Sequence, residues 1–255
     1  MSLTPDDQLD YKLLTQEKIQ EALDLQAETM LQENLAIGLG MFEEAGAPEE
    51  MRLVFKEVIK DGATLIAVDR KTNELAAVAF NIIHASFQFH ILPSSPLIPK
   101  PGEEDKMEVF VEENLRHRST RQLVKFVGDI ESSVDIFDTY NVHGVMELFY
   151  LGTNPRYQGR GIGLKMVQKC IELGRGLLSG SMRRYSFGDD PVEQHTRPEL
   201  IYGVFTSNYS QRIADTLGLE PLNEVRYEDF TFAGKKMSER IGAFHKTARL
   251  QILKF

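Results

Sequence analysis

Three glycines near the middle of the chain follow a short apolar run. Residues 146–151 read MELFYL, a strand-type run, and the turn signal Asn154-Pro155 precedes Gly159, Gly161 and Gly163. From Gly163 onward, apolar residues recur at steps of three and four, as on one face of an amphipathic helix. Glycines at a helix start leave backbone N–H groups uncovered, and the helix dipole adds about half a positive charge there. This pattern predicts that the main chain binds a phosphate or pyrophosphate.

Two better-known phosphate loops do not fit these residues. A P-loop requires Gly-Lys-Ser/Thr, whereas Gly163 is followed by Leu164, Lys165 and Met166, with no hydroxyl for magnesium. A Rossmann loop requires a third glycine three residues after the second, where this chain has Leu164. The segment QGRGIG at 158–163 instead has the form Gln/Arg-x-x-Gly-x-Gly/Ala.

That segment, with the strand before it, Tyr157 and the helix after it, resembles the cofactor loop of the GNAT family of acetyl-CoA-dependent N-acetyltransferases. The resemblance implies that loop amides hold the pyrophosphate of acetyl-CoA and that the main chain of the preceding strand pairs with the pantetheine arm. No metal is expected. The implied cofactor-binding residues are Leu151, Gly152, Thr153, Gln158, Gly159, Arg160, Gly161, Ile162, Gly163 and Ser207. The alternative is that the glycines only allow close packing of helix against strand.

A second segment resembles the arylalkylamine N-acetyltransferase-like enzymes of invertebrates. Their first loop reads Asp-Glu-Pro-Leu before a Leu-Gly pair, and this chain has QENL at 32–35 before GLG at 38–40, without the aspartate and the proline. The resemblance makes Glu33 the general base. An alkylammonium has a pKa near ~10.4, so a base must remove its proton at neutral pH. The alternative for Glu33 is a loop carboxylate that caps a helix or faces solvent.

A third segment carries the candidate general acid. Residues 206–212, TSNYSQR, followed by Leu-Gly-Leu at 217–219, are similar to Ser-Ser-His-Tyr-Ser-x-Arg ending in Leu-Gly-Phe in the same enzymes. The resemblance implies that Ser210 protonates the leaving thiolate and that Thr206 stands for the accompanying serine. Many other GNAT enzymes use a tyrosine four residues later, where this chain has Ala214. Tyr209 stays a competitor, and Ser210 could instead satisfy backbone donors at the helix start.

Composition limits the classes of partner. The chain has 255 residues, 42% hydrophobic and 26% charged, with a formal net charge of −9. Such acidity opposes a general nucleic-acid binder and is compatible with a cationic small-molecule amine. No apolar run reaches the ~20 residues of a membrane span, and the acidic start does not resemble a signal peptide. The single cysteine excludes an intramolecular disulfide, so we expect a cytoplasmic protein that does not bind membranes. These patterns leave the amine and the oligomeric state open.

Several other reactive side chains have less specific surroundings. The six histidines show no metal-ligand spacing, although His84 and His90 flank an irregular segment and either is a candidate proton relay. Cys170 lies on the apolar face of the central helix, which favours core packing over a nucleophilic role. The pair Arg183-Arg184 has two interpretations, a contact with a cofactor phosphate or a solvated surface.

The elements that must position these residues follow from periodicity and turn signals. The expected order is a strand at 11–14, a helix from Thr15 to about 31, a helix at 48–60, a hairpin of 63–68 and 75–83, a long amphipathic helix at 123–137, the strand at 146–151, the glycine-loop helix, a strand at 200–206, a helix ending at 217–219, and strands within 224–232 and 247–255.

This order resembles the GNAT fold over nearly the whole chain. The implied class is α/β (α+β), with a central mixed, mostly antiparallel sheet flanked by helices. We expect a mobile leader at 1–10 and a single domain at 11–255 with insertions near 86–120 and 178–199, the first serving as a lid over the substrate side. The implied reaction is direct transfer of an acetyl group from acetyl-CoA to a primary amine of a small molecule. The alternatives are a non-catalytic acyl-CoA-binding module and a protein N-acetyltransferase.

Overall fold

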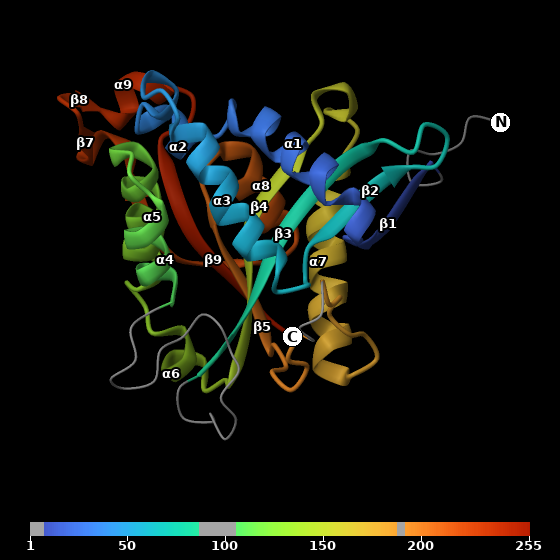
Figure 1. Cartoon of the computed structure of the whole chain (residues 1–255). Helices are drawn as coiled ribbons and strands as arrows, with labels where there is room; N and C mark the ends of the chain where they lie inside the picture. Colours follow the sequence, from blue (N-terminus) through green and yellow to red (C-terminus); the bar gives the residue numbers. More distant parts are fainter. Residues whose placement is uncertain (1–7, 87–105, 188–191) are drawn as a thin grey trace.

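A seven-stranded sheet forms the centre of the computed structural model, which describes residues 8–86, 106–187 and 192–255 (Figure 1). Its strand order is β1-β2-β3-β4-β5-β9-β6, and only the β4–β5 pair is parallel. The strands are β1 Leu9–Leu13, β2 Leu65–Asp69, β3 Leu75–Ala85, β4 Gly144–Thr153, β5 Leu200–Phe205, β6 Glu220–Arg226 and β9 Thr247–Lys254. A separate ribbon pairs β7 Thr231–Phe232 with β8 Lys235–Lys236. The predicted mixed, mostly antiparallel sheet is thus confirmed.

Helices cover both faces of this sheet. The α-helices are α1 Ile19–Met30, α2 Asn34–Gly38, α3 Ala47–Ile59, α4 Lys106–Asn114, α5 Arg118–Glu131, α6 Ile136–Tyr140, α7 Ile162–Ser179, α8 Asn208–Thr216 and α9 Met237–Ile241. Single 3₁₀ turns occupy Gln16–Lys18, Met41–Glu43, Pro155–Tyr157 and Tyr227–Asp229. In Figure 1, α5 and α7 stand on opposite sides of the strands. Two apolar clusters result, one between the sheet and α1, α3 and α5, the other between the sheet and α7.

The sheet splits between β4 and β5. The two strands pair only at Met146 with Ile201 and at Glu147 with Tyr202, although β4 continues to Thr153. Beyond Glu147, β4 therefore keeps β3 on one edge and has no strand on the other. Alternate N–H and C=O groups on that free edge are available to a ligand. The split opens a cleft at the carboxyl ends of both strands.

A β-bulge at Phe149 alters β4 just past the split. Phe80 of β3 lies opposite Tyr150, whereas the next residue, Asn81, lies opposite Leu148, so Phe149 is an extra residue. An extra residue interrupts the alternation of side chains between the two faces. Phe149 and Tyr150 consequently lie on the same face, where both rings meet Phe55 at centroid distances of 5.5 and 5.1 Å. The residues after the bulge occupy the faces opposite to those that a regular strand would give.

The prediction of one long helix at 123–137 is wrong, because α5 ends at Glu131 and a separate helix, α6, begins at Ile136. Ser133 donates its hydroxyl to the carbonyl of Ile130 at 2.6 Å, and the Asp135 carboxylate accepts from the N–H of Asp138 at 3.0 Å. Such local side-chain bonds compete with continued helix. The spacing of apolar residues continues from α5 into α6, because both helices bury apolar residues in the same cluster.

Other predicted elements need smaller corrections. Residues 34–38 form the short helix α2 instead of a loop, and β1 starts at Leu9 instead of Tyr11. The predicted strand at 224–232 is replaced by β6, which ends at Arg226, and a 3₁₀ turn. The hairpin is confirmed as β2 and β3. Most of the predicted lid, including His90, lies outside the described residues.

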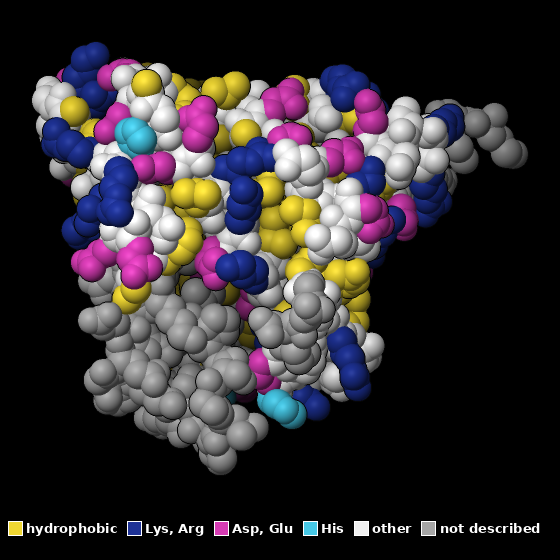
Figure 2. Space-filling view, viewed as in Figure 1, with side chains coloured by type: hydrophobic (Ala, Val, Ile, Leu, Met, Phe, Trp, Pro, Cys, Tyr) yellow, Lys and Arg dark blue, Asp and Glu magenta, His cyan; other side chains and the backbone are white. Residues whose placement is uncertain are grey.

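The face that carries α3 is electrostatically mixed. Figure 2, in the same view, shows Lys and Arg side chains interspersed with Asp and Glu, with hydrophobic side chains between them. The net charge of −9 is therefore not gathered into one acidic field on this side. This face therefore offers no single-sign field to attract a cationic substrate, and any electrostatic preference for a cation must come from side chains within a cavity.

Candidate active site

The glycine loop ends at the N-terminus of α7. Gly161 is the residue before the helix, with φ of +77°, and Gly159 has φ of +74°. A side-chain Cβ at either glycine would meet no atom within 4 Å, so the positive φ and not crowding favours glycine here. The first helical bond runs from the N–H of Lys165 to the carbonyl of Gly161 at 3.1 Å. The earlier N–H groups of the helix are thus available to an anion in the open space before the loop.

The end of β4 adjoins this loop. Gln158 donates its side-chain amide to the carbonyl of Thr153 and to Oε1 of Gln32, both at 3.2 Å, which links the loop to the segment before Glu33. Arg160 is exposed and stacks over the Tyr157 ring at 5.1 Å. The structure therefore brings the loop and the free edge of β4 together.

Glu33 lines the same cleft and is the N-cap of α2. One carboxylate oxygen accepts from the N–H of Ala36 at 2.7 Å, and the other accepts from the hydroxyl of Thr206 at 2.9 Å. Thr206 follows the last residue of β5, and its carbonyl accepts from Asn34 at 2.7 Å and from the Tyr227 hydroxyl at 2.6 Å. The position of Glu33 is therefore fixed by bonds to the end of β5.

Burial raises the pKa of Glu33, and its hydrogen bonds to backbone N–H groups and to Thr206 oppose that rise. Tyr150 lies nearby, with its hydroxyl 3.0 Å from the Thr29 hydroxyl, and burial together with Glu33 raises the pKa of this phenol. Tyr227, also buried, has a raised pKa for the same two reasons. The carboxylate therefore has neutral phenols around it and no lysine or arginine among its hydrogen-bond partners in the described residues.

Ser210 occupies the first turn of α8, where it forms a reciprocal capping box with Ser207. The Ser207 N–H donates to the Ser210 hydroxyl at 3.1 Å, and the Ser210 N–H donates to the Ser207 hydroxyl at 3.0 Å. The Ser210 hydroxyl in turn donates to the carbonyl of Ser207 at 3.0 Å. Tyr209, 67% exposed, packs on the rings of Phe244 and His245. Both candidate acids line the cleft, and Ser210 also stabilises the start of its helix.

One cavity of about 1660 Å³ connects these groups. A volume of that order exceeds the ~300–1,000 Å³ of an ordinary small-molecule pocket, so it has room for two substrates. Apolar side chains, among them Phe55, Phe149 and Val204, form the middle of its wall. The sequence-predicted residues that line it are Glu33, Leu151, Gly152, Thr153, Gln158, Gly159, Gly161, Ile162, Gly163, Ser207 and Ser210, whereas Arg160 does not.

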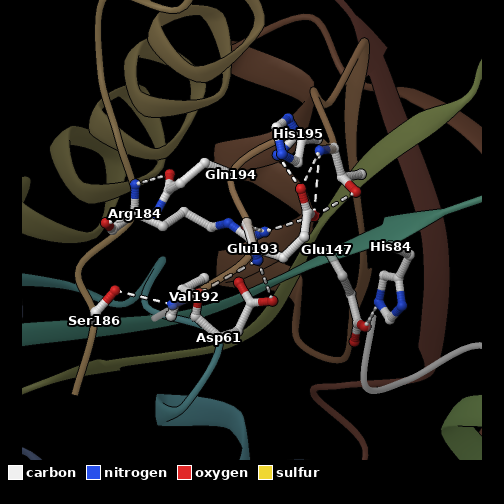
Figure 3. Close-up of polar contacts among 10 residues, drawn as sticks. Asp61, His84, Glu147, Arg184, Ser186, Val192, Glu193, Gln194 and His195 are labelled. Atoms are coloured by element: carbon white, nitrogen blue, oxygen red, sulfur yellow. Dashed lines mark hydrogen bonds and ion pairs between the residues drawn. The ribbon is translucent and has the colours of Figure 1, made fainter. Parts of the chain in front are cut away.

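Arg184 fits neither interpretation offered by the sequence. It is 8% exposed, and its guanidinium pairs with Asp61 at 2.8 Å and bonds the carbonyl of Glu193 (Figure 3). Gly62 approaches the same insertion so closely that a Cβ there would lie 2.0 Å from the carbonyl oxygen of Tyr185. Arg184 therefore anchors the 178–199 insertion to the end of α3, while Arg183 is exposed.

A second polar cluster lies inside the cavity, and His84 is its one member that the sequence indicated as a candidate. His84 of β3 lies 2.7 Å from the Glu147 carboxylate of β4, side by side in Figure 3, and Glu131 at the end of α5 adjoins the same carboxylate. The available signal was a charged residue, Glu147, within the apolar run MELFYL. Cys170 is fully buried, and burial raises the pKa of its thiol to about 12, which leaves it unreactive.

Within residues 8–86, 106–187 and 192–255, no group of three or more His, Cys, Asp and Glu side chains is arranged to hold a metal ion. None of the helices in those ranges combines the length and apolarity needed to span a bilayer.

The structure thus combines a split in a mixed α+β sheet with a helix N-terminus, preceded by glycines, that can bind an anion through its main chain. The sequence model of the Acetyltransferase (GNAT) family matches residues 42–194, more than half of the chain. The chain therefore belongs to the GNAT family of acetyltransferases, as the loop motif predicted. No curated protein sequence matches it.

Solved structures share this fold at low sequence identity. Arylalkylamine N-acetyltransferase 2 from Aedes aegypti is 15% identical with a TM-score of 0.71, covering 96% of this chain and 98% of that one. A polyamine N-acetyltransferase from Drosophila melanogaster, described as catalysing the formation of N-acetylagmatine, is 17% identical with a TM-score of 0.67 over 97% and 100%. The C-terminal condensation domain of Ebony, in complex with β-alanyl-dopamine, is 14% identical with a TM-score of 0.59 over 97% and 99%.

Proposed function

We propose that this protein transfers an acetyl group from acetyl-CoA to a primary amine of a small molecule, by direct attack in a ternary complex. The observation that carries the proposal is that one cavity holds both the free N–H groups at the start of α7 and the Glu33 carboxylate. The first suits the pyrophosphate of the donor, and the second suits the proton of the acceptor. The similar solved structures include N-acetyltransferases that are named for arylalkylamines and polyamines, which supports an amine as the acceptor.

Glu33 is the proposed general base. A protonated alkylamine is about three pKa units from neutrality at pH 7, so removing its proton requires roughly 4 kcal/mol. Burial raises the pKa of Glu33 and so makes it a stronger base than a carboxylate in water. The ammonium proton passes to Glu33 directly or through water, and the neutral amine nitrogen then attacks the thioester carbonyl.

The free edge of β4 is the proposed site of carbonyl polarisation. Main-chain N–H groups at Leu151 to Thr153 would donate to the pantetheine arm and to the developing oxyanion. When the tetrahedral intermediate collapses, the carbon–sulfur bond breaks and the thiolate takes a proton from Ser210, with Tyr209 as the competing donor. The positively charged nitrogen of the intermediate loses its extra proton, through water, to the deprotonated donor, which restores the hydroxyl. Ser210 must then release its bond to the carbonyl of Ser207.

An acetylation assay tests the proposal directly. The purified chain is mixed with acetyl-CoA and a panel of aromatic amines, alkylamines, polyamines and amino acids, and free thiol and acetylated product are measured together. We expect thiol release that depends on the amine, with stoichiometric N-acetyl product. Thiol release that is independent of every amine would contradict the proposal.

Two other functions share the fold and differ in the expected result. A non-catalytic acyl-CoA-binding module would bind acetyl-CoA and release no thiol with any acceptor. A protein N-acetyltransferase would acetylate peptides with an exposed amino terminus or lysine in preference to free amines. The deep cavity with an apolar middle favours a small acceptor over a protein chain.

A further inference from the structure

The cavity contains a second acidic site at the end opposite the glycine loop. Glu147 lies at the last β4–β5 pair before the split, and its side chain is only 6% exposed. Glu131 is the last residue of α5. Both carboxyls and His84 line the same cavity as Glu33. This cluster takes no part in the proposed acetyl transfer.

One carboxyl oxygen of this cluster lacks a donor among the described residues. Glu147 accepts from His84 at 2.7 Å, but Oε1 of Glu131 is buried and has no hydrogen-bond partner within the described part of the chain. Burial, followed by the charge and proximity of Glu147, raises the pKa of Glu131 well above its ordinary value. Tyr202 hydrogen-bonds Glu147, and burial together with the charges of Glu147 and Glu131 raises the pKa of its phenol, which stays neutral. Without a ligand, a proton must occupy the space between the carboxyls.

The spacing along β5 relates this cluster to the proposed base. Tyr202 lies opposite Glu147, and Thr206, which bonds Glu33, follows four residues later. Four residues of strand span about 13 Å. Between them, Val204 shares the face of both residues and lines the cavity together with Ile82 and Phe149. The cavity thus has a carboxylate at each end and apolar walls between.

We propose that the Glu131–Glu147 pair binds a second cationic group of the acceptor amine, so that the preferred substrates are long diamines or polyamines whose two cations are separated by a distance on the order of this 13 Å strand span. An ammonium or guanidinium placed between the carboxyls replaces the shared proton and supplies the missing donors. The alkyl segment lies against the apolar walls. This inference rests on the proposed function for the identity of the reacting end.

Cation binding at this pair is coupled to proton release. The bound cation favours the ionised form of Glu131, so binding the diamine expels the proton from the pair. Binding therefore weakens as pH falls, because below the raised pKa of Glu131 the proton competes with the cation. Among the described residues, His84 from β3 and Tyr202 from β5 are the titratable groups in contact with the pair, while Asp129 on α5 is paired with Lys125 at the surface.

Calorimetry with a matched pair of amines tests the inference. Octylamine and α,ω-diaminooctane have the same carbon chain, and only the diamine carries the second cation. In the presence of coenzyme A, we expect the wild-type chain to bind the diamine at least tenfold more tightly, since charged hydrogen bonds are worth that much. Titrations in buffers of different ionisation enthalpy should show proton release for the diamine alone.

Variants assign the effect to the pair. Glu131→Gln should remove the proton release and most of the preference for the diamine, and Glu147→Gln should also reduce the preference, while octylamine binds as before. Glu172→Gln, an exposed α7 residue paired with Lys169, should leave every value unchanged. Equal affinity for the two amines in the wild type, or a preference that survives in Glu131→Gln, would overturn the inference. Diamine binding without acetylation would instead refute only the proposed function.

Discussion

The Glu33 carboxylate accepts a hydrogen bond from the Thr206 hydroxyl at 2.9 Å, although 173 residues separate them in the chain. Thr206 is further held through its carbonyl by Asn34 and Tyr227. The bond joins the N-terminus of α2 to the end of β5, across the mouth of the split in the sheet. It fixes the proposed base relative to the strand edge on which the thioester is expected to lie.

Replacement of Glu33 by glutamine should lower kcat by about 10²–10⁴-fold, because an amide cannot accept the ammonium proton. In the wild type, kcat should fall as pH drops through the raised pKa of Glu33, since the protonated carboxyl is no longer a base. The variant should lose that acid limb. A pH series of thiol release measures both, with Glu28→Gln, an exposed residue of α1, as the control that keeps wild-type kinetics.

Loss of the Thr206 hydroxyl should move the acid limb of the pH profile. The hydrogen bond from Thr206 lowers the pKa of Glu33, so Thr206→Val should raise that pKa and shift the limb to higher pH. At alkaline pH, kcat should approach the wild-type value. Thr206→Ser, which keeps the hydroxyl, should restore the wild-type profile, and an unshifted limb in the valine variant would argue against Glu33 as the base.

Substitution of Ser210 by alanine should have two separable effects. Loss of its half of the capping box should lower the free energy of unfolding by about 0.5–2 kcal/mol. If Ser210 also protonates the thiolate, kcat measured well below the melting temperature should fall by about tenfold or more. Thr216→Ala, at the other end of α8, is the stability control. A stability loss with unchanged kcat would transfer the acid role to Tyr209.

Gly161→Ala should weaken acetyl-CoA binding. The positive φ of 77° makes alanine unfavourable by roughly 1 kcal/mol, and relief of that strain would turn the loop amides away from the anion site. Gly218→Ala is a matched control, because Gly218 has φ of +79°, similarly open space, and a position at the end of α8 outside the cavity. Both variants should lose similar stability by thermal melts, but only Gly161→Ala should raise the KM for acetyl-CoA.

Glu131→Gln should stabilise the protein at alkaline pH. A carboxyl with a raised folded-state pKa contributes stability that is present below its unfolded pKa and lost as pH rises through the folded value. Glutamine mimics the protonated form at every pH and so avoids this loss. Calorimetric melts near pH 8 should show an increase in Tm of about 2–4 °C for each kcal/mol added to the free energy of unfolding. Near pH 5, the Tm should change little. A variant that is less stable at alkaline pH would contradict a protonated Glu131.

The contiguous motifs were readable from sequence, and the long-range relationships were not. The strand, turn and glycines from Met146 to Gly163 act through local backbone conformation, so their spacing sufficed to predict the loop and the family. The break at Ser133 was missed because apolar periodicity does not register hydroxyls that bond their own backbone. Arg184 and Asp61 lie 123 residues apart, and no local pattern indicates that they meet in the interior. The Glu131–Glu147 pair was hidden for the same reason.

The bulge at Phe149 sets a constraint on sequence length. Because one extra residue lies between Leu148 and Tyr150, deletion of a single residue there would restore a regular register with β3. Tyr150 already lies opposite Phe80, so the side chains from Tyr150 to Thr153 would keep their faces, and only the Phe149 ring with its contact to Phe55 would be lost. Insertion of a second extra residue would instead slip the register, exchange the faces of the residues that follow it and turn their free N–H groups toward β3. Insertions should therefore be tolerated far less between 147 and 153 than in the neighbouring loops.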